Sequence, residues 1–282
     1  ANGSGDNTSP ESVTTGWSGF DVDADGVRLH VHRAGRRDRP AAVLAHGLGD
    51  SGRCWWRVAR AFERDFDLVM VDSRHHGRSS NATGPASTLA EDLAAVIDGL
   101  DLDRPLLIGH SIGARTVAQF AVSRPRQASG LVLIDPPWTR DRETDGDLRP
   151  AEREAIRGWL GSFADMTDAE LAALGRQQHP GWPEAEFATW IESKQQVHDT
   201  AADDLGGIGW GELVAGLEAA TLLVYGDPER GGIVTDDVAA RVSELNDRVT
   251  TVRVDGTGHH VHREDFDAFV GVVRPFLNAA SG

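Results

Sequence analysis

One serine in the sequence lies in a setting that suits nucleophilic chemistry. Ser111 is at the centre of Gly109-His110-Ser111-Ile112-Gly113, with a glycine two residues away on each side. Glycines at these positions let neighbouring backbone pass close to a sharp turn without a Cβ clash, and the turn projects the serine hydroxyl outward. The apolar residues 105–108 precede the turn and an amphipathic segment begins at Ile112, which predicts a strand-turn-helix context. Because the pattern alone also occurs in ordinary turns, this context is what favours Ser111 as a nucleophile.

A histidine late in the chain can supply the base that such a serine requires. Gly256-Thr257-Gly258-His259 follows the last predicted strand and precedes the last predicted helix. His260 and His262 are alternatives, but the glycine-framed position directly after the strand favours His259. His259 would accept the proton of Ser111 and later donate it to the leaving group.

Acyl transfer also needs two backbone N–H groups aimed at the substrate oxygen as it becomes negative. The N–H of Ile112, the residue after the nucleophile, is the first candidate. The second is expected in His46-Gly47-Leu48-Gly49-Asp50, where Gly47 permits a sharp turn and Leu48 donates. The sequence therefore predicts an oxyanion hole formed by Leu48 and Ile112.

The elements that would position these residues follow an alternating pattern. Apolar β-type runs alternate with segments of helical period, which is typical of an α/β fold with a mostly parallel sheet and helices on both faces. Ahead of them, Asp25-Gly26 separates two β-type runs and predicts a hairpin turn. Ser87-Thr88 ahead of Glu91 predicts a capping box for one helix. Strands are predicted at residues 19–22, 27–32, 41–46, 68–72, 105–109, 131–135, 221–226 and 250–254, and helices at residues 54–62, 88–100, 112–123, 234–245 and 265–277.

The alternation stops at residues 137–207, which contain helical segments but no strand-like run. Loop-length statistics favour an inserted helical unit, interpreted as a cap on a core of residues 16–136 and 208–282. Residues 1–15 are interpreted as a flexible lead because they are rich in Gly, Ser, Asn and Thr. The insertion holds four of the eight tryptophans, of which three are expected to line a substrate pocket: Trp138, Trp159 and Trp190. Two of its arginines could bind a substrate carboxylate or lie on the solvated face: Arg157 and Arg176.

Several segments occur in an order that is itself informative. They are His46-Gly47, Asp72-Ser73-Arg74-His75-His76-Gly77-Arg78-Ser79, Gly109 to Gly113 and Gly258-His259. The chain that carries these motifs resembles α/β-hydrolases from about residue 19 to its end. The resemblance implies a catalytic order of serine, acid and histidine, and structural roles for Asp72 and Arg74. At His75 the family commonly has glycine, so this loop is expected to differ in shape.

The acid of the implied triad has two possible positions. The family's usual one follows the strand at residues 221–226, where Asp227 and Glu229 are available. Members that resemble haloalkane dehalogenases and certain lactonases instead place it after the strand that follows the nucleophile helix, which implies Asp135. Asp135 closes an apolar strand, where a carboxylate is costly to bury without a partner. Asp135 is therefore ranked first, Asp227 second and Glu229 third, and all three stay open.

The composition disfavours several classes of partner. The chain has 44 acidic and 28 basic residues and a formal charge of −16, so repulsion opposes binding to nucleic acid or an anionic membrane surface. No apolar run approaches the length of about 20 residues that spans a bilayer. Cys54 is the only cysteine, which excludes an intramolecular disulfide and leaves the cytoplasm as the expected compartment. A monomer or homodimer acting on a small molecule is expected.

Together these features predict an enzyme that hydrolyses a carboxylic ester or lactone in two acyl-transfer steps, without a cofactor. Hydrolysis of a carbon–carbon or amide bond, or peracid formation as in cofactor-free haloperoxidase-like members, would use the same triad and is the alternative. A non-enzymatic ligand-binding homologue is disfavoured because Ser111 and His259 are both present. The late histidines lack a motif such as His-Glu-x-x-His, so no metal site is expected.

Overall fold

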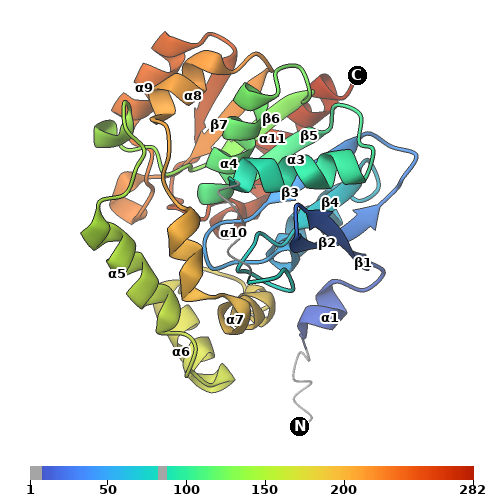
Figure 1. Ribbon diagram of the computed structural model, residues 1–282, viewed down its shortest axis with the longest axis vertical. Helices are drawn as coiled ribbons and strands as arrows, with labels where there is room; N and C mark the ends of the chain where they lie inside the picture. The colour runs from blue at the N-terminus through green and yellow to red at the C-terminus, as the bar shows by residue number, and fades with distance from the viewer. Residues whose placement is uncertain (1–7, 82–87) are drawn as a thin grey trace.

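A computed structural model describes residues 8–81 and 88–282 (Figure 1). Its strands are β1 (Ser18–Ala24), β2 (Val27–Gly35), β3 (Ala41–Ala45), β4 (Asp67–Val71), β5 (Leu106–His110), β6 (Gly130–Ile134), β7 (Thr221–Tyr225) and β8 (Val249–Arg253). They form one eight-stranded sheet in the order β1-β2-β4-β3-β5-β6-β7-β8. β1 and β2 form the predicted hairpin and β2 pairs antiparallel with β4, whereas the other pairs are parallel. The mostly parallel sheet predicted from the alternating pattern is confirmed.

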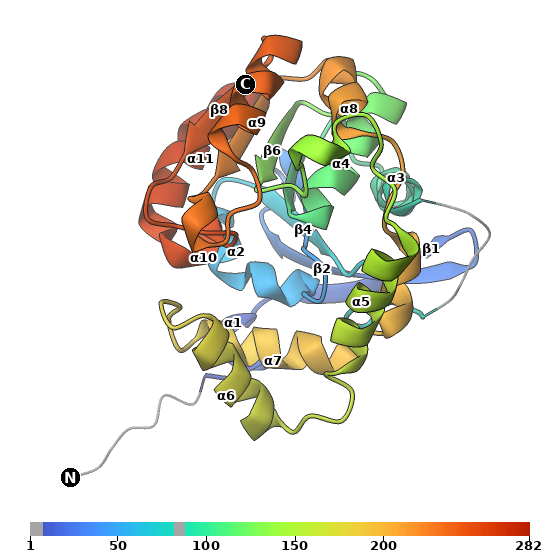
Figure 2. The ribbon, with the colours of Figure 1, turned by 90° about the vertical axis from the view of Figure 1, so that its left-hand side faces the viewer.

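Helices cover both faces of this sheet, as Figure 2 shows nearly edge-on. One layer contains α3 (Leu89–Gly99), α4 (Ile112–Ser123), α8 (Trp210–Gly216) and α9 (Asp236–Leu245), and the other contains η1 (Gly52–Trp55), α2 (Trp56–Phe62), α10 (Val261–Glu264) and α11 (Phe266–Ala280). On β5, Leu107 packs toward the first layer, and Leu106 and Ile108 pack toward the second. Because side chains alternate along a strand, this burial on both faces requires the continuous apolar runs seen in the sequence.

The chain between β6 and β7 forms a helical insertion, defined here as residues 137–207. It contains η2 (Arg140–Arg142), α5 (Pro150–Gly161), α6 (Asp168–Gln178), α7 (Glu186–Gln196) and η3 (Asp199–Asp204). Of these, α5, α6 and α7 lie together below the sheet in Figure 1 and at the bottom of Figure 2, whereas η2 pairs through Arg140 with Asp237 of α9. Trp182, Phe187 and Trp190 belong to a small apolar core within the insertion. Gly206 and Gly207, both at positive φ, then lead the chain into α8 and back to the sheet at β7.

The segment interpreted as a flexible lead is described only in part, and that part contains a short helix. Residues 1–7 lie outside the described residues, but Pro10–Val13 form a short helix, α1, with Ser9 as the capping residue. Glu11 on this helix pairs with Arg53 at 3.1 Å, which ties it to the core. In the predicted capping box of α3, Thr88 and Glu91 cap each other's backbone, whereas Ser87 lies outside the described residues.

The loop after β4 contains His75, at the position where α/β-hydrolases commonly have glycine. His75 adopts a φ of 66°, a region that favours glycine, so the histidine occupies a backbone conformation that glycine would adopt without strain. Its side chain contacts the helical insertion, with Nε2 3.0 Å from Asp204 Oδ2 and Nδ1 3.1 Å from Thr200 Oγ1. No helix in the described part of the chain is both long enough and apolar enough to cross a membrane.

Candidate active site

Ser111 lies on a strained turn between β5 and α4, near the middle of the sheet. Its φ of 54° and ψ of −121° fall outside the regions that non-glycine residues normally occupy. The turn is held by a hydrogen bond of 2.8 Å from Ser111 N to Ile134 O. The flanking glycines are required by packing, because a Cβ on Gly113 would overlap the carbonyl of Ala45 and one on Gly109 would overlap Gly113. The strand-turn-helix context predicted for Ser111 is therefore present.

Asp135 and His259 are brought together at the carboxyl end of β6. The carboxylate of Asp135 is fully buried, and its Oδ2 lies 2.6 Å from Nδ1 of His259. Since a carboxylate can only accept, Nδ1 of His259 carries the proton and Nε2 is left free to act as a base. Asp135 also accepts hydrogen bonds from the backbone N–H groups of Ile233 at 2.9 Å and Val234 at 3.0 Å. These donors fix the carboxylate against the imidazole.

The two other candidate acids have different surroundings. Asp227 binds the guanidinium of Arg253 and accepts from Gly256 N at 2.8 Å. The Gly256 hydrogen bond and the arginine lower the pKa of Asp227. Glu229 is exposed in the short η4 (Pro228–Arg230). Neither carboxylate contacts His259 within the described residues, so Asp227 stabilises the loop that carries the histidine instead of orienting its ring.

The loop that follows β3 runs beside the Ser111 turn. Gly47 lies so close that a Cβ there would be 2.8 Å from Nδ1 of His110. The N–H groups of Leu48 and Ile112 donate no hydrogen bond to another group in the described part of the chain. Free backbone donors beside the serine are what an oxyanion hole requires.

A lysine from the insertion anchors this same loop. Lys194 on α7 is buried, and its Nζ donates to Gly49 O at 2.6 Å and lies 3.1 Å from Asp50 Oδ1. Asp50 is also 3.2 Å from the buried guanidinium of Arg263. These cations hold the pKa of Asp50 far below its usual range even though burial alone would raise it. Lys194 was not predicted as a site residue, although it is the only lysine in the chain.

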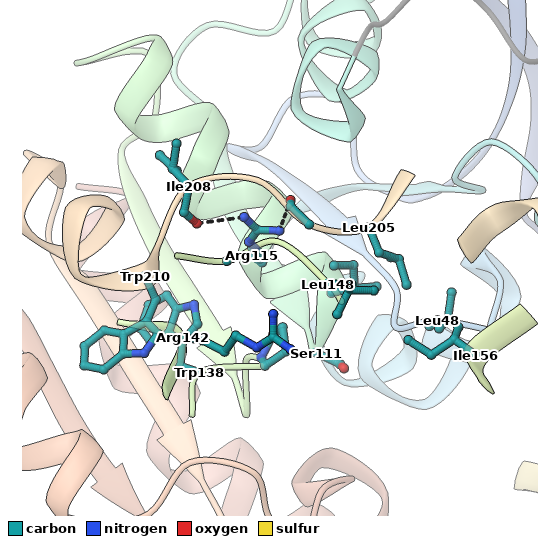
Figure 3. Close-up of a pocket in the computed structure, with 14 residues that line it drawn as sticks. Leu48, Ser111, Arg115, Trp138, Arg142, Leu148, Ile156, Leu205, Ile208 and Trp210 are labelled. Carbon is teal, nitrogen blue, oxygen red and sulfur yellow. Dashed lines mark hydrogen bonds between the residues drawn. The ribbon is translucent and has the colours of Figure 1, made fainter. Parts of the chain in front are cut away.

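Two cavities adjoin Ser111, and both also contact Leu48. The first, called here the arginine cavity, has a volume of about 170 Å³ and is lined by Ile112, Arg115 and Arg142 but not by His259 (Figure 3). The second, called the histidine cavity, has a volume of about 250 Å³ and is lined by His259 and Lys194. The Ser111 hydroxyl makes no hydrogen bond within the described residues. Catalytic hydrogen bonds are often completed only when substrate binds.

The aromatic residues predicted as pocket residues divide between these cavities. Trp138 lines the arginine cavity and stacks on Trp210 with a centroid distance of 5.9 Å. Trp159 and Trp190 line the histidine cavity. Trp210 was not predicted because it follows the insertion in the sequence, at the start of α8.

The arginines singled out in the insertion lie elsewhere. Arg157 pairs with Asp203, and Arg176 pairs with Glu184. Neither of these arginines lines a cavity that contains Ser111. Arg115 and Arg142 do, and the first could have been found from its place on α4, one helical turn after the nucleophile.

Histidines surround the predicted base. His110 packs 4.6 Å from His259, and His260 packs 4.9 Å from it, between ring centroids. Burial lowers the pKa of His110, His260 and His262 well below the ordinary value, and that of His179 to about 4. The neighbours of His259 are therefore uncharged near neutral pH.

Three of these histidines could also bind a metal ion. His110, His259 and His260 each offer a ring nitrogen, and the three atoms lie within 4.8 Å of one another. Imidazole nitrogen is a preferred ligand of Zn²⁺. Because Nδ1 of His259 is occupied by Asp135, such an ion would use Nε2 and would compete with proton transfer. His110 was not predicted as a possible ligand, because it is far in sequence from the late histidines.

Comparisons with known proteins agree with the fold. The profile of the Alpha/beta hydrolase family matches residues 42–272, so the chain belongs to that family and is a hydrolase. It is 28% identical over 276 residues to N-formylmaleamate deformylase from Pseudomonas putida, covering 94% of this chain and 98% of that protein.

Two solved structures share the fold. E-2-(acetamidomethylene)succinate hydrolase superposes with a TM-score of 0.79 and 20% identity, covering 93% of this chain and 99% of the other. The esterase RhEst1 from Rhodococcus sp. ECU1013 superposes with a TM-score of 0.74 and 23% identity, covering 94% of this chain and 99% of the esterase. Both structures are thus similar to this chain over nearly its whole length.

Proposed function

We propose that this protein is a serine hydrolase that cleaves a carboxylic ester or lactone through Ser111, His259 and Asp135. The observation that carries the proposal is the 2.6 Å hydrogen bond between Asp135 and His259, in a site that also contains a serine on a strained turn. A carboxylate in this position fixes the tautomer of the imidazole and stabilises the imidazolium that forms during the reaction. The helical insertion acts as a cap, because its side chains line both cavities beside the serine.

The reaction follows from these positions. Nε2 of His259 accepts the proton of Ser111, and Oγ attacks the substrate carbonyl carbon. The backbone N–H groups of Leu48 and Ile112 stabilise the oxyanion. The tetrahedral intermediate expels the leaving group, which takes the proton from His259, and an acyl-enzyme remains. Water, activated by His259, then releases the acid and regenerates Ser111.

Hydrolysis of a carbon–nitrogen bond is a second candidate. It is favoured by the relative named as a deformylase, which aligns with nearly the whole chain. The triad and the oxyanion hole would serve both reactions, since an amide and an ester pass through similar tetrahedral intermediates. The difference lies in the leaving group, which must be protonated more completely when it is an amine.

A labelling experiment tests the proposed nucleophile. A fluorophosphonate probe should label the wild-type chain, and Ser111→Ala should abolish the label. Labelling that persists in Ser111→Ala, or wild-type protein that is not labelled, would contradict the proposal and favour a non-catalytic binding protein.

A substrate panel then identifies the bond that is cleaved. The panel contains p-nitrophenyl esters, lactones, N-formyl amides and vinylogous diketones, together with an assay for peracid formation. Turnover of esters or lactones supports the first candidate, and turnover confined to the amides supports the second. Activity confined to the diketones or to peracid formation would reject both.

A further inference from the structure

We infer that the acyl half of the substrate carries a carboxylate, which Arg115 and Arg142 bind in the arginine cavity. This inference rests on the proposed function, because it assigns the two halves of a substrate to the two cavities beside Ser111. It specifies a half-ester or half-amide of a short dicarboxylic acid.

The position of His259 determines which cavity receives which half. The imidazole must donate its proton to the leaving group, so the leaving group has to lie on the side of the serine where His259 is. Of the two cavities that contain Ser111, the histidine cavity is lined by His259, whereas the arginine cavity shares Ser111 and Leu48 with it and adds Ile112. The acyl chain therefore extends into the arginine cavity.

The arginine cavity is an apolar pocket with positive charge. Its walls include Trp138, Leu148 and Ile156, and its charged lining residues in the described chain are Arg115 and Arg142, without a carboxylate. In Figure 3 the two arginines come from different elements, α4 and η2, into the pocket that contains Ser111. A pocket of this kind favours an anionic group on a short hydrocarbon chain.

Arg115 is a buried cation without a directly paired carboxylate in the described part of the chain. Its residue is 7% exposed, and its guanidinium donates to the carbonyls of Gly206 and Ile208, the second at 2.9 Å (Figure 3). It forms no ion pair with any acid in the described part of the chain, although the more distant charge of Asp147 raises its pKa. Burial outweighs Asp147 and lowers the pKa of Arg115, so its charge is only partly compensated. A substrate carboxylate would supply the missing negative charge.

The backbone leaves room for this guanidinium. A Cβ on Gly146 would lie 2.9 Å from Nη2 of Arg115, and one on Gly207 would lie 3.0 Å from it. The cation is thus held between two glycines and two carbonyls.

Arg142 adds a second cation on another side of the cavity. Its Nη2 lies 2.5 Å from Glu152 Oε2, and its Nη1 donates to the carbonyl of Asp147. Glu152 is shared with Arg149, so one carboxylate serves two arginines. The Nε–H of Arg142 donates no hydrogen bond within the described residues and is available to a ligand.

The volume of the cavity limits the length of the acyl chain. An apolar cavity of about 150 Å³ holds a molecule of benzene size, and the arginine cavity measures about 170 Å³. An acyl group of about seven heavy atoms, such as a succinyl group, is close to this limit. The reaction would release the alcohol or amine through the histidine cavity and leave a dicarboxylic acid after water attacks the acyl-enzyme.

Two pairs of matched substrates test this assignment on the full chain. In the first pair the acyl group differs only in charge: mono-4-nitrophenyl succinate carries a carboxylate, and 4-nitrophenyl succinamate carries the neutral amide. In the second pair the leaving group differs in charge: 4-acetoxybenzoate is compared with 4-acetoxybenzamide. We expect kcat/KM for the succinate to exceed that for the succinamate by about tenfold or more, as a hydrogen bond to a charged group contributes. We expect no such preference in the second pair.

Variants of the arginines connect this preference to the cavity. Arg142→Gln should reduce the succinate-to-succinamate ratio of kcat/KM toward 1, and Arg115→Gln should do the same. Arg157→Gln is the matched control, because Arg157 also belongs to the insertion but pairs with Asp203 outside the cavity. This control should keep the wild-type ratio.

The outcomes separate this inference from the proposed function. Fluorophosphonate labelling of Ser111 with equal rates for succinate and succinamate would overturn the inference alone. A charge preference in the acetoxybenzoate pair only would reverse the orientation and also overturn it. If Arg142→Gln and Arg115→Gln both keep the wild-type succinate-to-succinamate ratio, the charge preference arises from other residues and the inference is overturned. Failure of Ser111 labelling together with failure of hydrolysis would overturn both proposals.

Discussion

Asp135 and His259 are separated by 124 residues in the sequence, yet Oδ2 of the first lies 2.6 Å from Nδ1 of the second. Their contact joins the end of β6 to the loop between β8 and α10. Because Asp135 is fully buried and is also bound by two backbone N–H groups, its carboxylate cannot turn away from the imidazole. Because the pair is held rigidly, an isosteric substitution of Asp135 tests its role without moving its neighbours.

Asp135→Asn should lower kcat by about 10⁴-fold, since an amide favours the wrong imidazole tautomer. Asparagine tolerates positive φ, so the turn at Asp135, with φ 40°, should persist and the fold should be kept. Steady-state kinetics and circular dichroism measure the two effects. Asp227→Asn is the control and should retain most of the activity, because Asp227 binds Arg253 and Gly256 instead of His259. A large loss in Asp227→Asn with little loss in Asp135→Asn would reverse the assignment.

Gly113→Ala should destabilise the protein by about 3 kcal/mol, near the upper end for overpacked sites. The new Cβ would overlap the backbone carbonyl of Ala45, which cannot move without disturbing β3. Gly271→Ala on α11 is the matched control, since nothing lies within 4 Å of the added Cβ. It should stabilise the helix by about 0.5–1 kcal/mol. Urea unfolding of both variants gives the comparison, and equal stabilities would contradict the packing argument.

Lys194→Met should lower kcat by about 10- to 100-fold with a smaller change in KM, because the loop that presents Leu48 loses its anchor at Gly49. Arg53→Met is a control: Arg53 also joins the insertion to the core, through Glu192 at 2.8 Å, but not through this loop. If Lys194 only stabilised the fold, both variants would lower the melting temperature and leave kcat unchanged.

His76 should make the stability depend on pH. Burial lowers its pKa to about 3, whereas the unfolded chain has the ordinary value near 6.5. Between these values the unfolded state binds a proton that the folded state does not, so the free energy of unfolding falls as pH decreases. At pH 5 this one residue should account for about 2 kcal/mol of lost stability.

The measurement for His76 is urea unfolding at pH 7, 6 and 5. His76→Gln should show a weaker loss of stability than the wild type over this range, since it removes one titrating group. Parallel pH profiles for the two proteins would show that His76 does not contribute.

Local sequence was sufficient for the fold class, the Ser111 turn and the loops that carry Leu48 and His259. Strands buried on both faces need continuous apolar runs, and a sharp turn needs Gly109 and Gly113, so these features are recorded in neighbouring residues. The choice among Asp135, Asp227 and Glu229 depended on tertiary structure, because each follows a strand and only packing decides which carboxylate meets the imidazole. Arg115 was open to prediction from the sequence, since it lies on α4 one helical turn after Ser111. Arg142 and Lys194 were not, because they come beside Ser111 only when the helical insertion folds onto the core, which brings distant segments together without a local sequence signal.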